Sequence, residues 1–418
     1  MRSEQSRSLA ARWAVVVLLA LAALISYIDR INLASALPEI RKSIPLSPEA
    51  SGVLLSSFFW MYTFLQVPAG WVVDRYGVRW PFTFGLLLWS MVSASTALAA
   101  TLGEMIAARL LLGFGESIVT PGAMHYIRMK FPEQNRGLAI GIFLAGTKWG
   151  PAIGAPVAAY LVAAYGWRPM FVMTGLGGLI WLLPWLLIVK KKAHDWAPPR
   201  LSIPNEPPTT DTVSWKAVFS TPVIWGILLG TFCYNYFVYF CMTWMPTYFK
   251  ERNQLSLTGS GWFTFLSFGG MAIIAMLAGF VADLLIARGR EAVTVRKSFT
   301  IAGFLVASSA VIAVFTDSRP IALCVAVLSL SGLGLTTANY WGLTQTLMPA
   351  SAIGTVAGLQ NTAANLAGIA APWLTGIMVQ QTGRFDAPLM ALGFWMAVGV
   401  ASYVFLVRQP KKSEPTAN

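Results

Sequence analysis

Two ten-residue stretches, half a chain apart, decide how this sequence is interpreted. Residues 70–79 read GWVVDRYGVR, and residues 279–288 read GFVADLLIAR. In both, a glycine is followed four residues later by an aspartate, and the two glycines are 209 residues apart in a chain of 418. A repeat at half the chain length indicates two tandem halves with the same organisation.

The apolar composition indicates that both stretches connect membrane-spanning segments. Hydrophobic residues make up 56% of the chain and charged residues 11%, whereas soluble domains carry about 25% charge. A soluble enzyme, a disordered chain and a coiled coil are therefore poor fits, and a lipid bilayer is the expected partner. The formal net charge of +13 does not indicate a nucleic-acid partner, because the basic residues lie in short loops between apolar runs.

The apolar runs are long enough to cross a membrane, which takes about 20 predominantly apolar residues per helix. Twelve such spans lie at 13–37, 51–73, 80–100, 104–127, 138–163, 169–189, 220–248, 258–286, 298–316, 320–347, 353–380 and 388–407. We therefore predict an all-α integral membrane protein with twelve transmembrane helices. Residues 190–219, rich in Lys, Pro and polar residues, are expected to link a six-helix bundle at 1–189 to a second at 220–418, which ends in a short cytoplasmic tail.

The placement of lysine and arginine predicts the orientation. With a cytoplasmic N-terminus, the inner connections hold 20 of the 30 Lys and Arg residues and the outer connections hold seven. Because cytoplasmic loops carry an excess of basic residues, both termini are expected in the cytoplasm. The sequence contains no Asn-x-Ser/Thr glycosylation sequon, which favours a bacterial inner (plasma) membrane.

The repeated loops have a mechanical interpretation. Tandem six-helix halves indicate a secondary transporter in which one half rocks against the other. A glycine permits close helix approach, and an aspartate at a helix end, with nearby arginines, can form a charge latch across the cytoplasmic face. The residues of this predicted cytoplasmic gate are Gly70, Asp74, Arg75, Gly77, Arg79 and Asp283.

The ionisable side chains that lie well within the predicted spans, away from their ends, all belong to the N-terminal half. They are Asp29, Arg30, Arg109, Glu116 and Lys148. A charge at the bilayer centre costs about 3 kcal/mol or more, so each is expected to face the protein interior and to be functional. The C-terminal half offers uncharged polar groups instead. We expect the first half to handle charge and the second to help shape the substrate pocket.

Helix geometry predicts that these charges form a line. At about 1.5 Å per residue, Asp29 and Arg30 lie about 10–12 Å, and Arg109 about 8 Å, inside the outer ends of their helices, so that they can meet. Glu116 follows Arg109 by seven residues, which places it on nearly the same helix face about 10 Å deeper. A proton relay beside an anion site needs such an arrangement.

Residues 70–79 resemble the signature loop of the major facilitator superfamily. The resemblance narrows at residues 27–32, YIDRIN, and at Arg109 with Glu116, which are similar to motifs of the anion:cation symporter family. That family includes bacterial galactonate, glucarate and hexuronate transporters and animal sialin. The resemblance covers essentially the whole chain and implies two pseudo-symmetric six-helix bundles.

The resemblance also implies roles for individual residues. In that family the matching acids, here Asp29 and Glu116, couple protons. The arginine matching Arg30 binds the substrate carboxylate, and the one matching Arg109 pairs with the acids. Substrate contacts are implied at Tyr27, Tyr62, Trp341 and Asn361. The chemistry fits, because a guanidinium binds a carboxylate through two parallel hydrogen bonds and does not deprotonate.

The fifth span departs from the family pattern. Some sugar-acid members have Gln where this chain has Thr147, and Lys148 follows where a neutral residue is expected. We interpret both as candidate substrate contacts. A structural partnership of Lys148 with Glu116 and a misplaced helix boundary are the alternatives. With both acids ionised the five charges sum to +1, and with one protonated to +2, so that a monoanion and a dianion both fit.

Histidine, cysteine and glycine patterns have plainer interpretations. His125 is expected to be structural or interfacial, and Gly146, Gly150 and Gly154 favour a closely packed helix over an antiporter motif. The two histidines and three cysteines show neither metal-ligand nor disulfide spacing, so no metal and no cofactor are predicted.

The sequence thus predicts a proton-coupled symporter that imports an organic carboxylate, a sugar acid such as a hexuronate or aldonate, by alternating access. Its partners are the small organic anion and the proton, and a monomer is expected. An organic anion exchanger and an importer of a dicarboxylate or aromatic acid remain open. A channel or receptor is the alternative from a different class. An enzyme is not predicted, because no nucleophile triad, metal cluster or phosphate loop appears.

Overall fold

The computed structural model describes residues 2–189, 221–348 and 350–408, which form helices without any strand. The predicted linker and most of the predicted C-terminal tail lie outside the described residues. The N-terminal half contains α1 (Arg2–Ser43), α2 (Pro48–Tyr76), α3 (Arg79–Ser95), α4 (Leu102–Glu116), α5 (Val119–Lys130), α6 (Glu133–Tyr165), α7 (Trp167–Gly178) and α8 (Leu182–Ile188). The C-terminal half contains α10 (Pro222–Glu251), α11 (Leu257–Ala287), α12 (Ala292–Ala307), α13 (Arg319–Leu347), α14 (Ala350–Thr382) and α15 (Asp386–Ala401).

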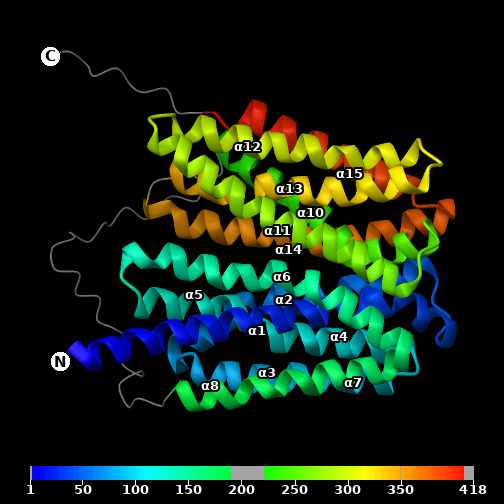
Figure 1. Ribbon diagram of the computed structural model, residues 1–418, viewed down its shortest axis with the longest axis horizontal. Helices are drawn as coiled ribbons and strands as arrows, with labels where there is room; N and C mark the ends of the chain where they lie inside the picture. Colours follow the sequence, from blue (N-terminus) through cyan, green and yellow to red (C-terminus); the bar gives the residue numbers. More distant parts are fainter. Residues whose placement is uncertain (1, 190–220, 349, 409–418) are drawn as a thin grey trace. The chain divides into compact units, whose positions relative to one another are not determined.

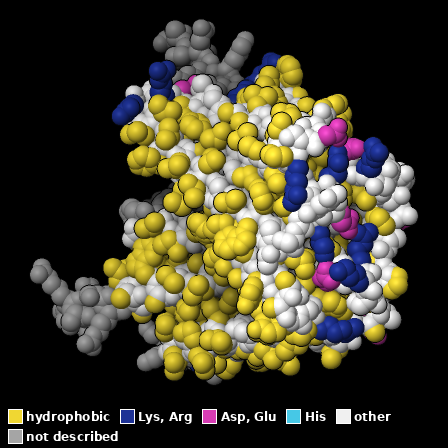
Figure 2. Space-filling view, turned by 45° about the vertical axis from the view of Figure 1, so that its right-hand side comes forward, with side chains coloured by type: hydrophobic (Ala, Val, Ile, Leu, Met, Phe, Trp, Pro, Cys, Tyr) yellow, Lys and Arg dark blue, Asp and Glu magenta, His cyan; other side chains and the backbone are white. Residues whose placement is uncertain are grey.

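Eleven helical segments of the described residues are long and apolar enough to cross a membrane, and each coincides within a few residues with a predicted span. Short 3-10 or π-helical stretches complete several of them: η1 (Thr96–Leu98), η2 (Leu179–Trp181), η3 (Ser308–Val314) and η4 (Ser402–Leu406). Large apolar side chains on these segments are exposed, as for Phe64 at 78% and Phe280 at 68%. Figure 2 shows hydrophobic side chains covering most of the face in view, as lipid contact requires.

The fourth predicted span, 104–127, is wrong as a single helix. It is broken into α4 and α5 at Ser117 and Ile118. The physical reason is Pro121, which has no N–H to donate to the carbonyl of Ser117 and whose ring clashes with that carbonyl in a continuous helix. The N–H of Ser117 still bonds the carbonyl oxygens of Gly113 and Phe114, so α4 ends at this residue with its last turn intact. The break follows directly after Glu116.

The described helices fall into two compact units. One contains α1 to α8 together with Tyr239–Ala272 of α10 and α11 and Gly368–Pro388 of α14 and α15, and the other contains the remainder of α10 to α15. Figure 1 shows α1 to α8 running side by side along one direction.

A stripe of glycines fixes how α6 packs on α1 in the first unit. A Cβ at Gly150 would lie 2.5 Å from Cβ of Tyr27, one at Gly154 2.8 Å from Ile31, and one at Gly146 would overlap the carbonyl oxygen of Ala20. Only glycine permits this approach of two helices. The expectation of a closely packed helix here is confirmed, and the contact supports the part of α1 that carries the predicted site.

Candidate functional site

An ion pair joins α1 to the end of α4 in the first unit. Arg30 donates from Nε to Oε2 of Glu116 at 2.8 Å. Ser26, one turn earlier on α1, donates from Oγ to the same oxygen at 2.7 Å. The side chains of Arg30 and Glu116 are 4% and 0% exposed. α1 therefore holds one oxygen of this carboxylate at two points, shielded from solvent.

Three aromatic rings enclose the Arg30 guanidinium. Its Cζ lies 4.4 Å from the ring centroid of Tyr27 and 4.5 Å from those of Phe58 and Tyr62. Rings at this distance attract a cation through their π electrons and leave its N–H donors free. Nη1 of Arg30 is buried and has no hydrogen-bond partner among the described residues. Arg30 therefore retains a donor for a further acceptor.

The side chain of Asp29, the residue before Arg30, is bonded to a different helix, α3. Its Oδ1 accepts a hydrogen bond from Oγ of Ser93 on α3 at 2.8 Å. Its Oδ2 and Oε1 of Glu116 are buried acceptors that lack a hydrogen-bond partner within the described part of the chain. Each acid thus has one oxygen held by a serine and one oxygen free to take a proton.

Arg109 meets Asp29 as its depth in the helix predicts, but through the backbone. Nη1 of Arg109 donates to the main-chain carbonyl oxygen of Asp29 at 3.4 Å. Arg109 is only 5% exposed, so its guanidinium is inside the bundle rather than extended to the surface. Its positive charge balances the acids from a distance, while the direct ion pair of Glu116 is with Arg30.

Lys148 and Thr147 lie in the middle of α6, so a misplaced helix boundary is wrong as an explanation of Lys148. Lys148 is half-buried and interacts electrostatically with the hydroxyl of Tyr27, whose ring stacks on Arg30. Thr147 is also half-buried, and its hydroxyl donates to the carbonyl oxygen of Leu144 at 2.7 Å.

Trp341 and Asn361 belong to the second unit, on α13 and α14, and both are half-buried. The ring of Trp341 lies 5.5 Å from that of Tyr340, which in turn lies 4.8 Å from Tyr234. The other eight predicted binding and coupling residues lie in the first unit. The first unit therefore holds all the charged residues of the predicted site together with Tyr27, Tyr62 and Thr147, and the second unit holds Trp341 and Asn361.

Sequence reasoning missed three residues that contact the charged side chains. Ser26 and Ser93 are single small polar residues in apolar spans and carry no signal of their own. Phe58 precedes Tyr62 by four residues on α2, and this one-turn spacing of two aromatic residues is a signal that could have identified it. Their rings stack 5.2 Å apart.

The repeated loops form one ion pair in each unit, but not the predicted latch of Asp74 with a nearby arginine. Oδ1 of Asp74 pairs with Nδ1 of His125 on α5 at 2.8 Å. Oδ1 of Asp283 pairs with Nη2 of Arg296 on α12 at 2.9 Å. An imidazole from the neighbouring helix reaches the first aspartate, so His125 has the structural use expected of it.

The arginines of the first copy stack on aromatic rings instead. Arg75 lies over Trp71 and Tyr76, at 5.5 and 5.8 Å, and Arg79 lies over Trp80 at 5.3 Å. Neither therefore needs Asp74 as a partner.

The two glycines that precede the aspartates are not equivalent. A Cβ at Gly70 would meet its nearest neighbour, Pro121, at an ordinary 4.0 Å, whereas one at Gly279 would lie 3.3 Å from Ala338. Close helix approach thus explains the second glycine and not the first. Gly77 ends α2 with φ +68, a conformation that glycine adopts without strain.

Helices of both sequence halves meet within the first unit, at the end of α1 opposite the N-terminus. Arg41 pairs with Glu251 of α10 at 2.9 Å, and Glu39 pairs with Lys250. A Cβ at Gly52 of α2 would lie 2.6 Å from a carbonyl oxygen of α14. We call the two ion pairs the ionic clasp.

Comparison with known proteins defines the family. The Major Facilitator Superfamily pattern matches residues 19–372. The chain belongs to the major facilitator superfamily. The D-galactonate transporter of Escherichia coli O6:H1 is 28% identical to it over 96% of both chains. The hexuronate transporter of Bacillus subtilis is 30% identical, over 91% of this chain and 90% of its own length.

Solved structures agree on the fold. A bacterial homologue of the human lysosomal transporter Spinster, in an inward-facing and unoccupied conformation, superimposes with a TM-score of 0.74 at 19% identity, over 95% of both chains. The resemblance stated from residues 27–32 and 70–79 is confirmed, as are the membrane fold and its twelve-span plan, apart from the break in the fourth span. The protein is a multi-pass membrane transporter by family, rather than a member of an enzyme family.

Proposed function

We propose that the protein is a proton-coupled symporter that imports an organic carboxylate, a sugar acid such as a hexuronate or aldonate, by alternating access. Relatives along nearly the whole chain are named for galactonate and hexuronate. The observation that carries the coupling is the Arg30–Glu116 ion pair, which is buried and whose guanidinium is enclosed by aromatic rings. Nη1 of Arg30 and Oε1 of Glu116 have no hydrogen-bond partner among the described residues.

The coupling follows from competition for one guanidinium. While Glu116 is ionised it occupies Nε of Arg30, and a substrate carboxylate must share that cation with it. A proton on Glu116 removes its charge and leaves Arg30 as a buried cation without a counter-ion, which is costly. A substrate carboxylate supplies the missing negative charge through a bidentate contact. Proton and anion therefore each favour binding of the other, as linkage requires.

The count of buried charges favours one proton per monoanion. Asp29, Arg30, Arg109 and Glu116 are all buried, and with both acids ionised their charges cancel. One proton and one monoanion entering together leave that sum unchanged. Lys148 is only half-buried and adds one positive charge beside this balanced group. It is therefore the residue that would accept a second acidic group, if the substrate is a diacid.

The remaining features support alternating access. The ionic clasp and the Gly52 contact with α14 join helices of both sequence halves at the end opposite the N-terminus. Opening of the site toward that end requires these contacts to separate. The lysine and arginine distribution supports a location in the bacterial inner membrane with both termini cytoplasmic.

Uptake into proteoliposomes tests this function. The purified chain should accumulate radiolabelled galactonate or hexuronate when the outside is more acidic than the inside. Glu116→Gln mimics the protonated acid permanently, so it should spare exchange between equally loaded compartments and abolish accumulation. The matched control is Glu104→Gln, because Glu104 lies on the same helix at an exposed capping box where glutamine also fits.

The outcomes separate the candidate functions. Exchange without accumulation by the unmodified protein would identify an organic anion exchanger instead. Unchanged accumulation by Glu116→Gln would remove Glu116 from the coupling mechanism.

A further inference from the structure

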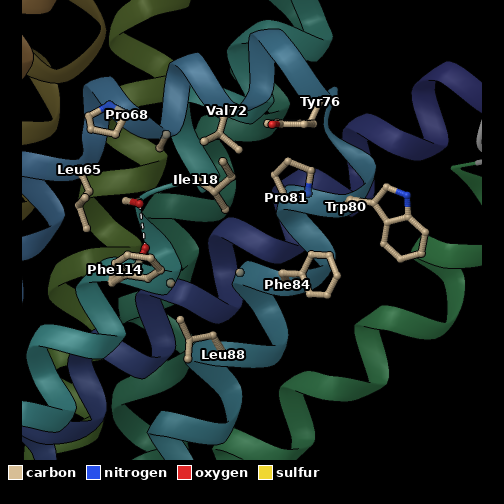
Figure 3. A pocket seen from close by; sticks show the side chains of 14 residues that line it. Leu65, Pro68, Val72, Tyr76, Trp80, Pro81, Phe84, Leu88, Phe114 and Ile118 are labelled. Atoms are coloured by element: carbon tan, nitrogen blue, oxygen red, sulfur yellow. Dashed lines mark hydrogen bonds between the residues drawn. The ribbon is translucent and has the colours of Figure 1, made fainter. Parts of the chain in front are cut away.

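A groove in the surface of the first unit lies beside the break between α4 and α5. It has a volume of about 660 Å³ and is bounded by α2, α3 and the α4–α5 turn. Figure 3 shows its apolar lining, which includes Leu65, Val72, Phe84, Leu88, Phe114 and Ile118. The volume falls within the roughly 300–1,000 Å³ that is usual for ligand sites.

The groove opens on the apolar surface of the bundle. Phe84 is 64% and Phe114 50% exposed, although both lie in the predicted spans, 80–100 and 104–127. Side chains this apolar and this exposed face lipid rather than water. The medium that fills the groove in the membrane is therefore hydrocarbon.

Two cations stand at one end of the groove. Tyr76 and Trp80 belong to its lining, and each is covered by an arginine: Arg75 stacks on Tyr76 and Arg79 on Trp80. The nearby acid, Asp74, is paired with His125. Tyrosine and tryptophan are typical of the membrane–water interface, so this end lies at the level of the lipid headgroups, where the two guanidinium groups can meet a phosphate.

We propose that the groove binds an anionic phospholipid, with an acyl chain along its apolar lining and the phosphate held by Arg75 and Arg79. An apolar channel that ends in aromatic residues and two arginines matches the order of groups in such a lipid. Arginine near a membrane surface favours anionic lipid, and guanidinium groups bind phosphate oxygens in pairs.

The bound acyl chain would pack against the residues on either side of Glu116. Gly115, Ser117 and Ile118 belong to the lining, and they flank Glu116, whose carboxylate pairs with Arg30 on α1. A lipid in the groove therefore packs against the turn that positions Glu116. Its presence does not depend on the proposed substrate, so the two proposals can fail independently.

Lipid retention by the purified full chain tests the headgroup contact. Native mass spectrometry of detergent-solubilised protein, titrated with phosphatidylglycerol or phosphatidylcholine, measures the affinity for each lipid. The double variant Arg75→Gln, Arg79→Gln should lower the phosphatidylglycerol affinity on the order of tenfold and leave the phosphatidylcholine affinity unchanged. The control is Arg288→Gln, Arg290→Gln, which removes two exposed charges at the end of α11.

Filling the groove tests the acyl-chain contact. Val72→Trp places a large ring in the lining and should weaken both lipids equally. Val281→Trp is the matched control, because Val281 occupies the same position in the repeated stretch and is not part of this lining. For the unmodified protein, added salt should release phosphatidylglycerol and not phosphatidylcholine.

The results that would overturn the proposal are specific. Equal loss of phosphatidylglycerol in the Arg75/Arg79 and Arg288/Arg290 variants would mean that any basic loop suffices. Lipid retention unchanged by Val72→Trp would show that the groove holds no acyl chain. Identical salt dependence for the two lipids, measured on the unmodified protein, would overturn the phosphate contact without relying on any variant.

Discussion

In the N-terminal half, α1 and α4 bury two acids and two arginines together, whereas the buried polar groups of α10, α13 and α14 in the C-terminal half are neutral, and two hydrogen-bonded pairs join different helices. Nε2 of Gln360 donates to Oγ1 of Thr231 at 3.0 Å, and the hydroxyls of Tyr234 and Thr337 are 2.8 Å apart. Neutral pairs of this kind keep the same charge at every physiological pH.

This contrast restricts the places in the molecule where proton coupling can reside. Only a group that gains and loses charge can link anion binding to a proton, and in the described helices such buried groups cluster on α1 and α4. The neutral half can shape a pocket and donate hydrogen bonds without altering the proton count. Variants in the two halves should therefore fail in different ways.

The largest effect is expected at Arg30. Arg30→Lys keeps the charge but loses the paired N–H donors that bind a carboxylate bidentately. It also loses the planar guanidinium that stacks on three aromatic rings. Substrate affinity should fall about 100-fold or more, corresponding to about 3 kcal/mol, as measured by calorimetry on the purified protein. Arg168→Lys is the control. Cζ of Arg168 lies 4.3 Å from the ring centroid of Trp167, and this arginine is on α7 rather than on the helices of the two acids. Near-normal affinity in Arg30→Lys would contradict the assigned role.

A selective effect is expected at Lys148. Met keeps a similar length and suits an apolar interior. If the ammonium group meets a second acidic group, Lys148→Met should weaken a diacid by orders of magnitude and a matched monoacid much less. Competition by the two analogues at several pH values provides the measurement. Equal loss for both would assign Lys148 to balancing Glu116 instead.

A smaller effect is expected in the neutral half. Tyr234→Phe removes one hydrogen bond, to Thr337, which contributes about 1 kcal/mol. Affinity should change by less than about tenfold, and the number of protons taken up with substrate should stay the same. A changed proton number in this variant would break the division between the halves.

The smallest effects are expected in the repeated loops. Asp74 and Asp283 are 73% and 69% exposed, so each ion pair contributes about 0–1 kcal/mol to stability. In thermal unfolding, Asp74→Asn and Asp283→Asn should therefore each lower the melting temperature by no more than a few degrees. A much larger loss in either variant would show that its aspartate does more than form an exposed ion pair.

The sequence predicts the spans well because hydropathy depends only on composition along about 20 residues. Hydropathy does not reveal the break after Glu116, although Pro121 provides a local reason for it. The meeting of Asp29, Arg109 and Glu116 follows from depth and helix periodicity.

Individual hydrogen bonds do not follow from periodicity. Arg109 donates to a backbone carbonyl, and Asp74 pairs with His125. Both contacts depend on how each helix is rotated about its axis relative to its neighbours, and local sequence patterns do not specify that rotation.

Proton uptake on substrate binding shows whether Glu116 and substrate compete for Arg30. Calorimetric titration with the same substrate in two buffers of different ionisation enthalpy gives the number of protons bound per substrate. About one proton is expected for the unmodified protein and for Glu104→Gln, and none for Glu116→Gln. Substrate binding without proton uptake in the unmodified protein, or undiminished uptake in Glu116→Gln, would contradict that competition.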